Sequence, residues 1–163
     1  MHNFVHFFNA IVMLICFMIC KMTENSIGIA VADDSPIHRK LISIILKRDP
    51  RFHLHAVFNN GSDLILAIDQ MDLKPSVYFL DILMPIKNGP QTTILLKELN
   101  PNALIFGYTS LFCSPMVDQM YYNGAKKIYQ KGEKSLQLIF DEIYECCILE
   151  WAEWYLPYGS INI

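Results

Sequence analysis

The sequence predicts an α/β fold in which a parallel sheet is flanked by helices. Short apolar runs alternate five times with segments whose apolar residues recur at helical spacing, which is typical of such a sheet. The 163 residues are 53% hydrophobic and 18% charged, so they have the composition and length of one globular domain. No internal repeat or low-complexity linker divides them.

Five short apolar segments are the predicted strands. The first ends in the acids Asp33 and Asp34, and the third delivers Asp81 at its carboxyl end. Near-continuous apolar runs of this length are typical of buried parallel strands. The predicted strands cover residues 27–33, 53–58, 77–80, 103–108 and 127–130.

A helix is predicted after each strand, with start and stop signals. Ser35 and Pro36 supply an N-cap and a first-turn proline, and Asp49-Pro50 ends that helix. Ser62 is the predicted N-cap of the second helix. The helices are expected at residues 36–49, 63–71, 90–100, 115–123 and from 135 onward.

Residues 4–20 form an almost wholly apolar segment without a charge. These 17 residues fall short of the roughly 20 that a spanning helix needs, and no basic start or small-residue cleavage site marks a secretory signal. Three interpretations of residues 1–21 stay open, namely a start assigned too far upstream, a membrane anchor and a cleaved signal. Because Lys21, Arg39 and Lys40 follow the segment, an anchor would leave the rest of the chain in the cytoplasm.

Polar residues follow four of the predicted strands: Asp33 and Asp34, then Asp81, Thr109 and Lys131. Taken singly, the first two acids are equally well explained as helix-capping residues, and Thr109 and Lys131 as solvated turn residues. Sites in open α/β sheets form outside the carboxyl ends of the strands. Together these residues therefore predict one pocket.

The predicted pocket has the chemistry of a phosphoryl-transfer site. Carboxylates about 4 Å apart repel one another by several kcal/mol, and Mg²⁺, which prefers oxygen ligands, relieves this repulsion. Asp81 is then placed to attack a phosphoryl donor and form an acyl phosphate. Lys131 would pair with the new charge, and the Thr109 hydroxyl would donate to a phosphoryl oxygen.

Charge and cysteine content exclude other classes. The net charge of −3 offers no broad basic face, so direct DNA binding is not expected. The five cysteines lack zinc-site spacing. An odd number without a disulfide framework suits a reducing compartment, and we expect a cytoplasmic location.

The polar motifs resemble those of response-regulator receiver domains of two-component signalling. The matching segments are Ala32-Asp33-Asp34, residues 81–89 (DILMPIKNG), Thr109-Ser110 and Gly124-Ala125 with Lys131. Residues 26–148 carry the resemblance, and loop details are similar to NarL/FixJ-type receivers without their DNA-binding domain. The resemblance implies a flavodoxin-like (βα)5 doubly wound sheet with strand order 2-1-3-4-5.

The resemblance also implies roles for single residues. Asp81 matches the phosphorylated aspartate, Thr109 the switch hydroxyl and Lys131 the phosphate-binding lysine. The matching Mg²⁺ ligands are Asp34 and Asp81 directly, Asp33 through a bound water, and the backbone carbonyl of Leu83.

Two positions depart from the family pattern. Ile128 stands where an aromatic switch residue is usual, and Tyr129 next to it is expected to face the other side of the sheet. The usual coupling between threonine and aromatic is therefore in doubt. Gly132 replaces the common proline after the lysine, so the cis peptide of that motif is not expected.

The C-terminal residues 149–163 are too short for a helix-turn-helix module. Trp151, Trp154 and Tyr155 share a helical face, for which packing against the domain is favoured over docking a partner.

The main hypothesis is a single-domain regulator that a histidine kinase or phosphotransfer protein phosphorylates and that signals through an unknown downstream protein. It would catalyse only its own phosphotransfer and dephosphorylation. The alternatives are a phosphorylation-independent binding module of the same fold and a truncated remnant of a DNA-binding regulator. A flavin-binding protein is disfavoured, because the acidic pocket suits an unchelated phosphate poorly.

Overall fold

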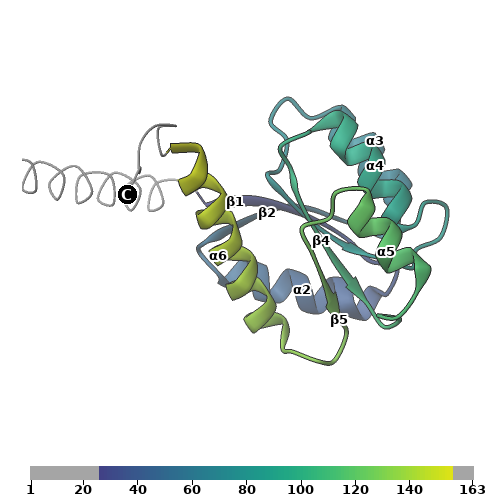
Figure 1. The fold of residues 1–163 in the computed structure, drawn as a ribbon. Helices are drawn as coiled ribbons and strands as arrows, with labels where there is room; N and C mark the ends of the chain where they lie inside the picture. Colours follow the sequence, from purple (N-terminus) through teal and green to yellow (C-terminus); the bar gives the residue numbers. More distant parts are fainter. Residues whose placement is uncertain (1–25, 156–163) are drawn as a thin grey trace, which may run out of the picture.

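Five parallel strands in the order β2-β1-β3-β4-β5 form the sheet of this protein. The computed structural model describes residues 26–155, with side chains to residue 151 (Figure 1). The fold class and strand order predicted from the sequence are confirmed. The elements are β1 (Ile27–Ala32), α2 (Pro36–Arg48), β2 (Phe52–Phe58), α3 (Gly61–Asp69), β3 (Val77–Asp81), α4 (Gly89–Leu99), β4 (Leu104–Thr109), α5 (Pro115–Tyr122), β5 (Lys127–Gln130) and α6 (Leu136–Tyr155).

Two apolar layers cover the faces of the sheet. In β3, Phe79 faces a cluster that includes Phe140 of α6, whereas its neighbour Tyr78 faces a cluster that includes Leu64 of α3 and Leu96 of α4. Successive strand residues point to opposite faces, so a fully buried strand needs apolar residues at every position. Helices α2 and α6 cover one face, and α3, α4 and α5 cover the other (Figure 1).

The second helix begins earlier than the sequence analysis predicted. Its N-cap is Asn60, whose side chain accepts a hydrogen bond from the backbone N–H of Asp63, and not Ser62. Asn60 is buried, and its amide oxygen supplies the acceptor that the first helical N–H groups need. The prediction of Ser62 as the cap was wrong.

The last helix extends to Tyr155, as its aromatic spacing indicated. Trp151 is half-buried and packs against the cluster under α2 and α6, in agreement with its expected role in the domain body. The side chains of Trp154 and Tyr155 and the apolar segment 1–21 lie outside the described residues. Within the described part of the chain, the helices are too short or too polar to cross a membrane.

Candidate functional site

Three aspartates meet at the carboxyl ends of β1 and β3. These strands are neighbours, with Ala32 beside Leu80, so the residues that follow them are brought together. One carboxylate oxygen from each of Asp33, Asp34 and Asp81 lies within 4.8 Å of the other two. Asp33 and Asp81 are buried, and Asp34 is exposed.

The backbone around the first acid pair is held by residues of the following helix. The backbone N–H of Ser35 donates to Asp33 Oδ1 over 2.8 Å. Arg39 Nη1 donates to the carbonyl oxygens of both Asp33 and Asp34, each over 2.7 Å. The sequence analysis missed Arg39 in this role. Its place one helical turn after the predicted N-cap Ser35, and so close to the acid pair, was the available signal.

Lys131 joins the two buried carboxylates although it lies far from them in the chain. Its Nζ donates to Asp81 Oδ2 over 2.7 Å and to Asp33 Oδ2 over 3.0 Å, and its side chain is 11% exposed. Burial opposes the charged ammonium, but the hydrogen bonds and charges of Asp81 and Asp33 outweigh it and raise the pKa of Lys131. The lysine is therefore held as a cation beside Asp81.

The site holds more negative charge than Lys131 neutralises. Burial raises the pKa of the Asp81 carboxyl, and the charge of Asp33 adds to this, although Lys131 and the backbone N–H of Leu83 act in the opposite direction. Three carboxylates that offer only oxygen atoms fit a hard cation such as Mg²⁺, which takes few carboxylates and keeps several waters.

Leu83 and Thr109 complete the surroundings of Asp81. The backbone N–H of Leu83 donates to Asp81 Oδ1 over 3.2 Å. Thr109 is fully buried at the end of β4, and its hydroxyl oxygen accepts a hydrogen bond from the backbone N–H of Leu111 over 3.1 Å. The N–H of Lys131 donates to the Thr109 carbonyl over 2.7 Å, which ties the two strand ends together.

The loop between Asp81 and α4 closes back onto its own start. The backbone N–H of Gly89 donates to the Ile82 carbonyl over 2.9 Å. A Cβ at position 89 would lie 2.9 Å from the Asp81 carbonyl oxygen and 2.8 Å from Ile82 Cα, so only glycine fits this close approach. The loop geometry therefore positions the backbone of Asp81.

Ile128 and Tyr129 face opposite sides of the sheet, as expected from strand alternation. Ile128 packs among the residues under α3, α4 and α5, while Tyr129 packs with those under α2 and α6. An aromatic residue nevertheless reaches Ile128 from α5: the hydroxyl of Tyr121 accepts a hydrogen bond from the Ile128 N–H over 3.1 Å. Past Lys131, Gly132 adopts a φ of 88°, which a proline ring cannot reach.

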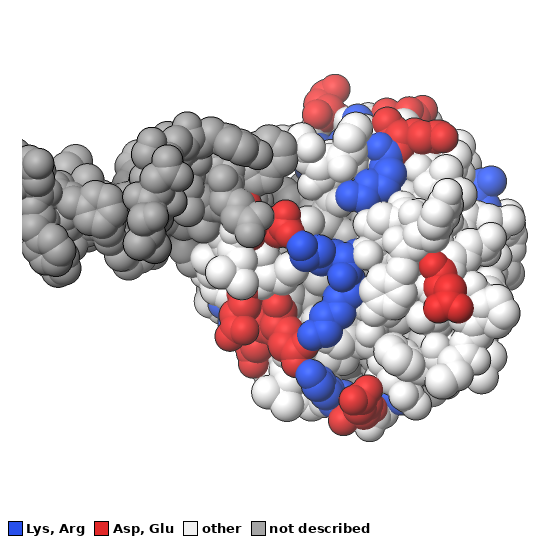
Figure 2. Space-filling model, viewed as in Figure 1, with Lys and Arg blue, Asp and Glu red and all other residues white. Residues whose placement is uncertain are grey.

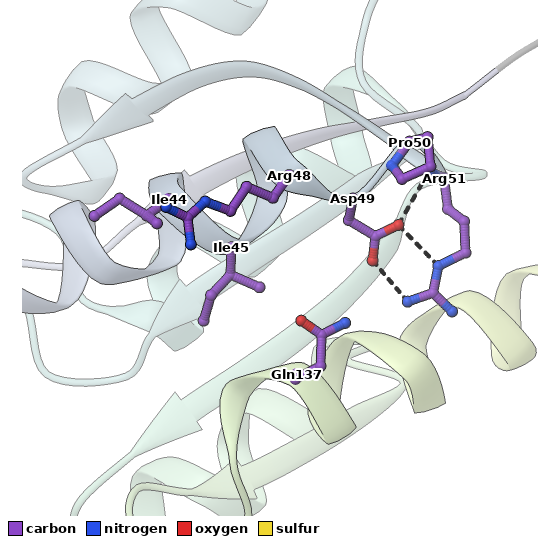
Figure 3. A pocket seen from close by; sticks show the side chains of 7 residues that line it. All are labelled: Ile44, Ile45, Arg48, Asp49, Pro50, Arg51 and Gln137. Atoms are coloured by element: carbon purple, nitrogen blue, oxygen red, sulfur yellow. Dashed lines mark hydrogen bonds and ion pairs between the residues drawn. The ribbon is translucent and has the colours of Figure 1, made fainter.

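A second charged cluster precedes β2, at the amino edge of the sheet. Arg51 pairs with the buried Asp49 over 2.6 Å and with Asp141 of α6. The hydrogen bond from Arg51 lowers the pKa of Asp49. Asp49 and Arg51 border a cavity of about 350 Å³ between α2 and α6, in which Arg51 points at Asp49 and Arg48 points away from it (Figure 3).

Relatives of known sequence share this region. The chain is 34% identical over 125 residues to the protein-glutamate methylesterase/protein-glutamine glutaminase of Oceanobacillus iheyensis, a match over 73% of this chain and 35% of that protein. The protein of the same name from Clostridium acetobutylicum is 33% identical over 116 residues, covering 70% of this chain and 33% of its own length. The chain thus spans about a third of these relatives.

Solved structures share the fold. CheY from Borrelia burgdorferi, in a complex with CheX, BeF3 and Mg²⁺, superposes with a TM-score of 0.66 at 18% identity, over 74% of this chain and 89% of that one. The receiver domain of a NarL regulator from Mycobacterium tuberculosis gives a TM-score of 0.62 at 19% identity, over 77% and 98%. The model of the response regulator receiver domain family matches residues 29–141, and the chain belongs to that family.

Proposed function

We propose that this protein is a phosphoacceptor that takes a phosphoryl group from a histidine kinase or phosphotransfer protein onto Asp81. The observation that carries this proposal is the position of Lys131, whose ammonium bridges Asp81 and Asp33 in a pocket of three carboxylates. Such a pocket binds a cation, which relieves its surplus of negative charge, and the cation together with Lys131 then neutralises an incoming phosphoryl group.

The transfer exchanges one bond to phosphorus for another. An oxygen of Asp81 forms the new O–P bond while the P–N bond of a donor phosphohistidine breaks, and the leaving imidazole keeps the electron pair. Asp33, Asp34, Asp81 and the Leu83 carbonyl would hold Mg²⁺, which neutralises charge on the phosphoryl oxygens. Lys131 pairs with one of these oxygens. The Thr109 hydroxyl donates to another after its side chain rotates away from the Leu111 N–H. The proposed chemistry is confined to phosphorylation and dephosphorylation of this chain.

The surface around β5 is the proposed place where phosphorylation is communicated. A band of lysine side chains lies here, with acidic side chains of α6 on one side and mainly uncharged surface on the other (Figure 2). Lys127 pairs with Glu142 over 2.6 Å, and Lys134 pairs with the same carboxylate. Tyr121 of α5 is exposed beside it and lines the same hollow as Lys127 and Lys134. A downstream protein would contact this face in a phosphorylation-dependent manner.

Labelling with acetyl phosphate and Mg²⁺ tests the proposal. The wild-type chain is expected to acquire an acid-stable, base-labile acyl phosphate that Asp81→Asn abolishes. Asp49→Asn is the matched control, because it changes a buried aspartate outside the site and leaves the label in place. A wild-type protein that stays unlabelled would sink the proposal.

A binding module that works without phosphorylation is the second candidate. Ile128 favours it, because its buried aliphatic side chain replaces the aromatic that usually moves toward threonine. Partner affinity that is equal for phosphorylated wild type and Asp81→Asn would favour this candidate.

The chain outside residues 26–148 has separate proposed roles. We propose that residues 149–163 extend the domain as a C-terminal helix and tail, and that the domain works in the cytoplasm. Residues 1–21 are either absent from the native product or a membrane anchor. N-terminal sequencing of the native protein distinguishes these two.

A further inference from the structure

We propose that His38 is a positioning residue for Lys131, holding its ammonium between Asp33 and Asp81. This inference rests on the proposed phosphoacceptor function and assigns a residue that the motif of the site does not contain. His38 lies in the first turns of α2, five residues after Asp33, and its ring reaches back over the pocket.

The contacts of Lys131 carry this inference. An ammonium has three N–H donors and no acceptor. In this structure its Nζ lies 2.7 Å from Asp81 Oδ2, 3.0 Å from Asp33 Oδ2 and 3.3 Å from His38 Nδ1. The three donors therefore have three acceptors, each from a different element of the fold.

A hydrogen bond from Lys131 to His38 requires one tautomer of the imidazole. Because the ammonium only donates, Nδ1 of His38 would carry the lone pair in that contact and Nε2 the ring proton. Nδ1 also lies 3.4 Å from Asp33 Oδ2, the carboxylate oxygen that accepts from the same ammonium.

Tyr108 fixes the orientation of the imidazole ring. The two rings meet edge to face with their centroids 6.0 Å apart, and the Lys131 ammonium lies 5.1 Å from the centroid of the tyrosine. Tyr108 is itself buried against Phe79, with ring centroids 5.2 Å apart. His38 is thus braced from the core, although about a third of its side chain is exposed. A braced acceptor restricts the rotation of a long, flexible side chain.

Loss of the acceptor should slow the phosphorylation of Asp81. In His38→Leu the third N–H of Lys131 turns to water, and the ammonium spends less time beside Asp81. We expect the rate of labelling by acetyl phosphate with Mg²⁺ to fall roughly three- to tenfold, the effect of one hydrogen bond of ordinary strength. His38→Asn offers an amide oxygen near the position of Nδ1 and should restore most of the rate. His53→Leu, at the exposed position of β2, is the matched control and should match the wild type.

Imidazole ¹⁵N chemical shifts give a readout that is independent of labelling. We expect the Nε2–H tautomer to predominate for His38 in the wild type. In Lys131→Met its population should fall, because the donor to Nδ1 is gone. An unchanged labelling rate in His38→Leu, failure of His38→Asn to restore it, or a proton on Nδ1 would overturn the inference. An unlabelled wild-type protein would instead overturn the proposed function, so the two failures are distinguishable.

Discussion

Each edge of the sheet joins one basic side chain to a buried aspartate, but the pKa of that aspartate moves in opposite directions. At the amino edge, Arg51 forms ion pairs with Asp49 and Asp141, and its hydrogen bond lowers the pKa of Asp49. At the carboxyl edge, one lysine serves Asp81 and Asp33 beside the exposed Asp34, and burial raises the pKa of Asp81.

The difference lies in burial and in the number of donors. Arg51 offers a forked guanidinium that gives Asp49 two side-chain hydrogen bonds, at 2.9 and 2.6 Å. Lys131 offers Asp81 a single hydrogen bond, and Asp81 is enclosed by the sheet. In the first cluster both carboxylate oxygens of Asp49 have a donor within the protein, so the cluster needs no further ligand and stabilises the fold. The second keeps a surplus of negative charge, which favours binding of a cation, and the cation would in turn balance a phosphoryl group.

The largest expected effect comes from breaking the complete cluster. Arg51→Gln leaves the buried Asp49 carboxylate without its partner, and we expect the free energy of unfolding to fall by about 2 to 3 kcal/mol. This is less than for a fully buried pair, because the Arg51 side chain is 30% exposed. Urea denaturation measures the change. Arg48→Gln is the control: among the described residues its side chain makes no hydrogen bond or ion pair, so it should change stability by less than about 0.5 kcal/mol. Equal effects of the two variants would contradict a structural role for Arg51.

A smaller effect of the opposite sign is expected at the site. The folded state binds a proton at Asp81 more tightly than the unfolded state does, so this residue lowers stability as the pH rises from below its ordinary pKa through the raised one. Without Mg²⁺, Asp81→Asn should stabilise the domain at pH 7, by about 1 kcal/mol, and give no gain near pH 3.

The pH dependence at Asp49 has the opposite sign. Its pKa is lowered on folding, so its stabilising contribution is present above the ordinary pKa and is lost as the pH falls through the folded value. Asp49→Asn should therefore destabilise the domain at pH 7. Thermal unfolding at both pH values measures these effects, and destabilisation of both variants at pH 7 would show that the two edges do not differ.

The smallest effect is expected for ion pairs on the surface. Lys134 pairs with Glu142, and both side chains are substantially exposed. Lys134→Gln should leave the midpoint of chemical denaturation close to that of the wild type, because water screens such pairs. A loss as large as that of Arg51→Gln would mean that exposure does not separate the clusters. Chemical denaturation of both variants in one buffer makes the comparison.

The sequence predicted the parallel sheet because strand ends carry their own signals, and the strand order followed from the resemblance to receiver domains. The acids after β1 and β3 and the lysine after β5 follow short apolar runs, and parallel topology brings such ends to one edge. The structure brings Asp33, Asp34, Asp81 and Lys131 together, while Thr109 joins them through its backbone. Their roles as ligands and phosphoacceptor stay predictions.

Side-chain contacts between different helices and strands could not be predicted from the sequence. Arg39 and His38 belong to an ordinary amphipathic helix by their pattern, and only the packing of α2 shows that both turn toward Asp33. The cap of α3 was missed for a related reason, because Asn60 and Ser62 are both good N-caps and the backbone path decides between them. The hydroxyl of Tyr121 at Ile128 likewise depends on how α5 lies across β5.

The close approach of Gly89 to Asp81 has a consequence for comparing natural variants of this chain. Since any side chain at position 89 would collide with the backbone of Asp81 and Ile82, a variant with another residue there must rearrange the acceptor loop. Such a variant could keep every charged residue of the pocket and still present Asp81 in a different orientation. The residue at position 89 is therefore a simple test of whether a homologous sequence retains this acceptor geometry, before any biochemical measurement.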